Sequence, residues 1–134
     1  TARKLPDVPV VRLLLRRTDR RLLARGPAVI DTGFDGGVYP SLEAVRLLEG
    51  LRPKFVEPLF HPLYGKIDSE VYELDAYLVL EGNEAITLGA VHVYTPTDPE
   101  YLSDESLIGR EIINKHRILF DGPAASLELL ETSK

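Results

Sequence analysis

The chain has 134 residues, of which 44% are hydrophobic, and these values predict a single domain with one core. The formal net charge of -5 excludes a general attraction to nucleic acid or anionic membrane, and no run of about 18 apolar residues predicts a membrane span. Because the sequence has no cysteine, it has no disulfide framework, thiol nucleophile or thiolate metal site, and we expect a cytoplasmic protein.

The charge is unevenly distributed along the chain. Residues 1–25 contain eight basic residues and two acidic ones, whereas the rest of the chain contains eight basic and nineteen acidic residues. The basic part could face a partner or the acidic remainder. A nucleic-acid surface there would need binding that weakens steeply with salt, and the net negative charge makes it the least favoured interpretation.

The first predicted elements form a hairpin. Two prolines predict an extended lead-in over 1–9. Segments 10–17 and 20–25 fit either a hairpin that turns over residues 17–20 or one basic amphipathic helix. The β-branched residues at the start of the first segment favour the hairpin.

A strand and a helix are predicted next. Gly26 and Pro27 predict a break, after which residues 28–31 form a short buried strand. Apolar residues at helical spacing predict a helix over 42–50, which a Pro-Ser pair opens and a glycine ends.

The rest of the chain is predicted to be mainly strand. Alternating and β-branched residues predict strands over 55–60, 67–74, 75–81 and 85–95. A loop over 96–105, a strand end that enters a short helix over 106–116, and closing strands over 117–121 and 126–131 follow. The sequence therefore predicts a mainly β domain with two short helices.

Residues 28–37 read AVIDTGFDGG and carry the motif with the clearest chemistry. The apolar run delivers Asp31 from a strand, and Gly33 permits a sharp turn behind it. Residues 107–110 read LIGR and repeat the pattern of two aliphatic residues, a glycine and a polar residue.

Together, VIDTGFDGG and LIGREIINKHRILFDGP resemble the retropepsin-like aspartic proteases of clan AA. The phenylalanine after DTG resembles the prokaryotic branch that has a DTGF motif. The resemblance covers about 10–130 and implies a closed, mainly β half-enzyme that forms a homodimer and cleaves a peptide or protein substrate. In such a dimer one aspartate from each subunit meets its mate at the two-fold axis, so this chain, with one DTG, would hold half a catalytic site.

The chemistry of such a pair needs neither metal nor cofactor. Two carboxylates about 3 Å apart in a cleft of low dielectric share one proton. The ionised partner takes a proton from a water bound between them, and the protonated partner polarises the scissile carbonyl and later protonates the leaving amine.

The resemblance implies a role for each residue of the motif. Asp31 is the catalytic residue, Thr32 bonds to its mate's backbone across the dyad or satisfies its own turn, and Gly33 leaves room beside the carboxylate. Phe34 replaces the alanine or serine of retroviral members and either shapes a substrate subsite or packs in the core. An acid at the position of Asp35 implies an ion pair with the arginine of the glycine-arginine motif, Arg110.

A flap over the substrate is a further expectation from the resemblance. The best candidate is 59–70, where Tyr64 and Gly65 could turn the tip of a hairpin. A surface hairpin without flap function fits the same residues, and Pro62 makes the tip less regular than that of viral members.

Two other interpretations stay open. The three histidines, His61, His92 and His116, are widely spaced and do not form a zinc-binding pattern, so we expect no metal. The alternative to a peptidase is a dimerisation or peptide-binding module that has the same fold and little or no catalytic activity.

Overall fold

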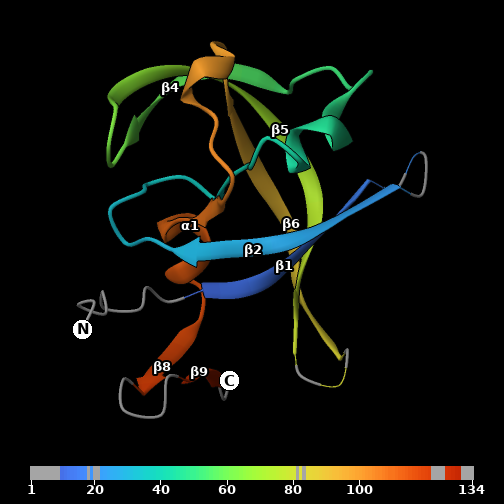
Figure 1. The fold of residues 1–134 in the computed structure, drawn as a ribbon, viewed down its shortest axis with the longest axis vertical. Coiled ribbons are helices and arrows are strands. Elements are labelled where there is room, and N and C mark those ends of the chain that lie inside the picture. Colours follow the sequence, from blue (N-terminus) through green and yellow to red (C-terminus); the bar gives the residue numbers. More distant parts are fainter. Residues whose placement is uncertain are drawn as a thin grey trace, which may run out of the picture.

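The computed structural model describes residues 10–17, 19, 22–80, 82, 84–121 and 126–130, and the predicted lead-in over 1–9 lies outside them. The described part is mainly β (Figure 1). Its strands are β1 (Val10–Arg17), β2 (Leu22–Ile30), β3 (Val38–Tyr39), β4 (Phe55–His61), β5 (Gly65–Val79), β6 (Ala85–Pro96), β7 (Ser106–Ile108), β8 (Arg117–Asp121) and β9 (Ser126–Leu130). Its helices are the 3-10 helices η1 (Ala44–Leu48) and η3 (Pro99–Tyr101) and the α-helix α1 (Arg110–Ile113).

Six of the strands close into a barrel. The main sheet has the order β1-β2-β7-β3-β6-β5-β4, and β1 also pairs with β5, which closes the ring and leaves β4 outside it. β2 is parallel to β7 and β3 is parallel to β6, while the other neighbours in this sheet are antiparallel. The prediction of a closed, mainly β fold with short helices is confirmed at this level.

The N-terminal hairpin is confirmed, but the predicted break at Gly26 and Pro27 is wrong. β1 and β2 pair without interruption from Val10↔Val29 to Arg17↔Leu22. β2 gains its second neighbour, β7, only from Ala28 onward. Pro27 therefore lies where β2 is still an edge strand, a place where a residue without an N–H is tolerated.

The predicted strands 67–74 and 75–81 are one strand, β5. β5 is long because its first half pairs with β4 and its last residues pair with β1, while β6 runs along both parts. The register between β5 and β6 shifts between Ala76 and Tyr77, where β6 has an extra residue, Leu88, beside Gly89, whose φ is +77°. The predicted boundary between residues 74 and 75 is therefore wrong, and the register shift two residues further on is a β-bulge within a continuous ladder.

The helix predicted over 42–50 is wrong in type and length. Only Ala44–Leu48 is helical, as the 3-10 helix η1, with bonds such as Arg46 N to Glu43 O (3.3 Å). The buried guanidinium of Arg17 donates to the carbonyls of Leu47 (3.2 Å) and Glu49. These carbonyls are satisfied by a side chain of β1, so a longer helix is not needed to satisfy them.

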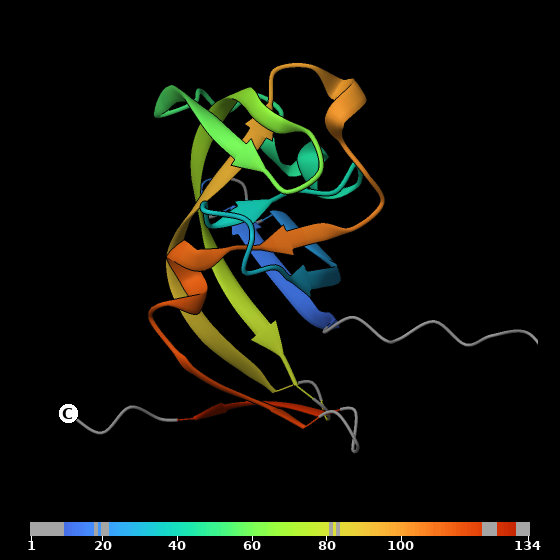
Figure 2. The ribbon, with the colours of Figure 1, turned by 90° about the vertical axis from the view of Figure 1, so that its left-hand side faces the viewer.

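The C-terminal predictions are largely confirmed. Strand β7 leads through Gly109 into the short helix α1, and the predicted loop over 96–105 contains η3. β8 and β9 pair only with each other among the described strands. Figures 1 and 2 place this pair at the opposite end of the molecule from the β4–β5 hairpin.

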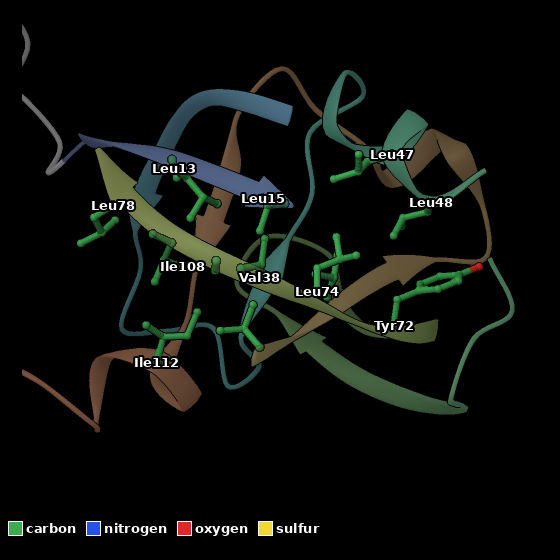
Figure 3. Packing of buried hydrophobic residues seen from close by; sticks show 14 of the residues in the cluster. Leu13, Leu15, Val38, Leu47, Leu48, Tyr72, Leu74, Leu78, Ile108 and Ile112 are labelled. Carbon is green, nitrogen blue, oxygen red and sulfur yellow. The ribbon is translucent and has the colours of Figure 1, made fainter. Parts of the chain in front are cut away.

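Two hydrophobic clusters stabilise the fold. The main core fills the barrel with side chains from all six barrel strands and from η1 and α1, among them Leu15, Leu74 and Ile108 (Figure 3). A second, aromatic-rich cluster consists of Phe34, Tyr39, Leu59, Ile67, Val71 and Tyr94. It joins the loop after β2 to the β4–β5 hairpin, so it positions the candidate site.

Candidate active site

Asp31 lies one residue beyond the end of β2. Its N–H donates to Ile108 O (2.9 Å), which extends the β2–β7 ladder by one residue and fixes the backbone where the carboxylate begins. The side chain is half-buried. Its Oδ1 accepts from Gly33 N (2.8 Å), and its carbonyl accepts from Phe34 N (3.2 Å). The turn thereby orients the carboxylate through one oxygen, and the other oxygen has no hydrogen-bond partner in the described part of the chain.

Gly33 separates the carboxylate from the β4–β5 hairpin. A Cβ at this position would lie 3.1 Å from Asp31 Oδ1 and 3.7 Å from Pro62 Cβ. A Cβ here would therefore press on the Asp31 carboxylate, which would have to shift by a few tenths of an ångström, while its contact with Pro62 would be an ordinary one. Thr32 is exposed, and its hydroxyl makes no hydrogen bond to another described residue.

Phe34 does not line a cleft, so the subsite interpretation is wrong. Its side chain is completely buried, and its ring meets those of Tyr39 (6.0 Å) and Tyr94 (6.1 Å) edge to face. The physical reason is that residues with large apolar surface gain most from burial, and Tyr39 of β3 and Tyr94 of β6 provide aromatic partners for this ring. Phe34 therefore anchors the Asp31 loop to the aromatic-rich cluster.

The predicted ion pair between Asp35 and Arg110 is not formed. Neither residue takes part in any of the ion pairs found among the described residues, and both are exposed, so water solvates their charges. Three backbone hydrogen bonds tie the loop to α1 in its place. They are Arg110 N to Phe34 O (2.8 Å), Glu111 N to Gly36 O (3.2 Å) and Gly109 N to Gly37 O (2.8 Å).

Glu111 reinforces this connection, and the sequence analysis missed it. Its carboxylate accepts a short hydrogen bond from the Tyr94 hydroxyl and lies 3.4 Å from His92 Nδ1. Burial, and then the bond to Glu111, raise the pKa of Tyr94. His92 and Tyr94 are two residues apart on β6, a spacing that puts both side chains on one face, but nothing local shows that this face meets Glu111.

The tip of the β4–β5 hairpin lies beside the Asp31 loop. The last pair of the ladder is His61↔Gly65, with Gly65 at φ +73°, so the turn residues are Pro62, Leu63 and Tyr64. The predicted flap residues Tyr64 and Gly65 thus close the turn on its β5 side. Figure 2 shows this hairpin curling over the end of the barrel.

A row of aromatic rings holds the tip down. His61 stacks on Tyr64 (4.6 Å) and meets Tyr39 (4.7 Å), and Tyr64 continues to Tyr101 of η3 (4.9 Å). Burial lowers the pKa of His61, and the charge of Asp31 acts in the opposite direction. His61 is therefore close enough to Asp31 for their charges to interact, which the spacing of 30 residues gave no means to foresee.

A pocket of about 350 Å³ lies elsewhere, between the β1–β2 hairpin and η1. Its lining includes Leu13, Arg25, Glu43 and Ser106 but not Asp31. No group of three or more potential metal ligands occurs among the described residues. In that same part of the chain, no helix has the length and apolarity needed to cross a bilayer.

Comparisons with models of known protein families and with curated proteins found no match.

Proposed function

We propose that this chain is one half of a retropepsin-like aspartic endopeptidase, and that two copies bring their Asp31 carboxylates together to hydrolyse peptide bonds. The observation that carries the proposal is the placement of Asp31. A half-buried carboxylate leaves a barrel strand, is oriented by its own DTG turn through one oxygen, and lies beneath a hairpin tip.

The mechanism follows from the chemistry of paired carboxylates. With about 3 Å between them, the two acids share one proton, because both cannot be ionised at that separation. The ionised Asp31 removes a proton from a water held between the pair, and the water oxygen attacks the scissile carbonyl. The protonated Asp31 polarises that carbonyl, and a proton then passes to the leaving amine.

Two features of the loop and one of the β4–β5 hairpin suit this role. The second carboxylate oxygen of Asp31 has no partner among the described residues and is therefore available to water or to the second copy. The exposed Thr32 hydroxyl is likewise available to bond to the mate's backbone. The β4–β5 hairpin can cover an extended peptide and exclude water from the reaction.

Replacing Asp31 by Asn tests the proposal, with Asp35→Asn as the matched control from the same loop. Fluorescently labelled casein serves as an unfolded substrate, and release of labelled peptides is the readout. Asp31→Asn should reduce the rate by about 10²-fold to 10⁴-fold, the usual contribution of a general base, because an amide cannot accept the proton of water. Asp35→Asn should retain the wild-type rate.

Sedimentation velocity on the same samples tests the assembly. Wild type and Asp31→Asn should both sediment as dimers at the concentrations that give activity. Wild-type cleavage by Asp31→Asn would overturn the proposal, and so would an active monomer. A dimer that binds labelled peptide without cleaving it would favour the peptide-binding module.

A further inference from the structure

The strongest unassigned feature is the side chain of His61 at the end of β4. Its Nδ1 accepts hydrogen bonds from the backbone N–H groups of Leu63 (3.0 Å) and Tyr64 (3.2 Å). Both donors belong to the turn that forms the tip of the β4–β5 hairpin. One imidazole nitrogen therefore satisfies two backbone donors of a turn whose side chains are largely exposed.

These bonds require a neutral imidazole. An Nδ1 that accepts cannot carry a proton, so the proton of neutral His61 resides on Nε2. Protonation of Nδ1 would turn the acceptor into a donor facing two other donors. Both hydrogen bonds would be lost, and the turn would no longer be fixed by this side chain.

The residues around His61 determine how readily its ring is protonated. Tyr39 of β3 and Tyr64 of the turn pack against its ring, and Tyr101 of η3 packs against Tyr64. Burial among these rings lowers the pKa of His61 from its ordinary value of 6.5, and Asp31, the charged group that faces it, acts in the opposite direction.

We propose that neutral His61 is a positioning residue that latches the hairpin tip over Asp31, and that its protonation releases the tip. The latch itself is a property of the hairpin. Its consequence for peptide hydrolysis, gating of access to Asp31, rests on the proposed function.

Amide hydrogen exchange measured by NMR tests the latch directly. The protection factors of the Leu63 and Tyr64 amides, corrected for intrinsic exchange, should fall about fivefold to tenfold as the pH decreases below 6.5, which is the factor expected for loss of one hydrogen bond. The fall should coincide with the titration of the His61 ring protons. Titration of His61 without any change at these amides would overturn the proposal.

Two variants separate the acceptor from the ring. His61→Asn keeps an oxygen that can accept from the N–H two residues on, as in an Asx turn, so the Leu63 amide should stay protected at every pH tested. His61→Phe keeps an aromatic ring and removes the acceptor, so protection should be low at every pH. Wild-type protection in His61→Phe would overturn the latch, and the wild-type titration decides the question if either variant fails to fold.

Asp31→Asn distinguishes failure of the latch from failure of the proposed function. The Leu63 and Tyr64 amides should stay protected in this variant near neutral pH. The pH at which half of their protection is lost should be lower than in wild type, because removing the carboxylate removes a charge that favours the imidazolium. Absence of peptidase activity together with these exchange results would reject the function and keep the latch. If casein is cleaved, equal kcat and KM in wild type and His61→Phe across the pH range would reject the gating and leave the function.

Discussion

Asp31 and Phe34 lie three residues apart in one turn, yet their side chains have opposite environments. The carboxylate is half-buried at the surface, and the phenyl ring is completely buried in the aromatic cluster behind it. The ring therefore holds the turn from within while the acid stays accessible.

Replacing Phe34 by Ala should destabilise the fold by about 3–5 kcal/mol, because it removes a fully buried ring and leaves a cavity between Tyr39 and Tyr94. Urea denaturation followed by circular dichroism measures the change. A loss below about 1 kcal/mol would contradict the anchoring role.

Gly109 should be far less tolerant of substitution than Gly26. A Cβ at Gly109 would lie 2.5 Å from Phe34 Cδ2 and 2.7 Å from Phe34 O, whereas a Cβ at Gly26 meets nothing within 4 Å. We expect Gly109→Ala to cost more than about 2 kcal/mol, since the loop and α1 would have to separate, and Gly26→Ala to stay within about 0.5 kcal/mol. Comparable thermal melting temperatures for the two variants would contradict this account.

The sequence predicted only those features of the site that depend on residues adjacent in the chain. The position of Asp31 after a strand and the need for Gly33 follow from ten adjacent residues. Glu111 and His61 could not be found in the same way, because their roles depend on neighbours supplied by β6 and by the hairpin tip. The predicted ion pair between Asp35 and Arg110 does not form, because water can solvate two exposed charges instead.

At the level of elements, β1 holds the barrel closed by pairing with β2 on one side and β5 on the other. Burial alternates along β1, since Leu13 and Leu15 are buried while Leu14 between them is only partly buried. Leu15→Ala should therefore cost about 2–5 kcal/mol, and Leu14→Ala clearly less. Equal losses in denaturant midpoint would show that β1 does not bury one face.

The sequence predicted the existence of most elements better than their limits. Alternation identified the strands because burial of one face is a local pattern, as in β1. The continuity of β5 and the continuation of β2 through Pro27 depend on which neighbouring strand lies alongside, and the shortening of the helix to η1 depends on Arg17. These limits are set by tertiary contacts that a single segment does not encode.

For the molecule as a whole, alkaline pH should weaken the fold. Burial, and then a hydrogen bond to Glu70, raise the pKa of Tyr72 to about 12, and burial also raises the pKa of Tyr39 and of Tyr94. A tyrosine with a raised folded-state pKa holds its proton more tightly when folded. Its stabilisation is complete below about pH 10 and is lost as the pH rises through the folded value.

The urea midpoint should therefore fall steadily from pH 10 to pH 12, and ultraviolet absorption should show phenolate appearing with the unfolding transition. Tyr72→Phe, which has no proton to lose, should show a shallower fall. A midpoint that is constant over this range would contradict the assignment.

The ring of six strands also fixes the order in which the barrel can form on the ribosome. β1 and β2 emerge first as a hairpin, but β1 needs β5 and β2 needs β7, whose residues are translated much later. Until Ser106–Ile108 has left the exit tunnel, the edge of β2 that pairs with β7 in the folded protein stays unpaired, with apolar side chains beside it. We therefore expect newly made chains to bind chaperones more readily than the folded protein does.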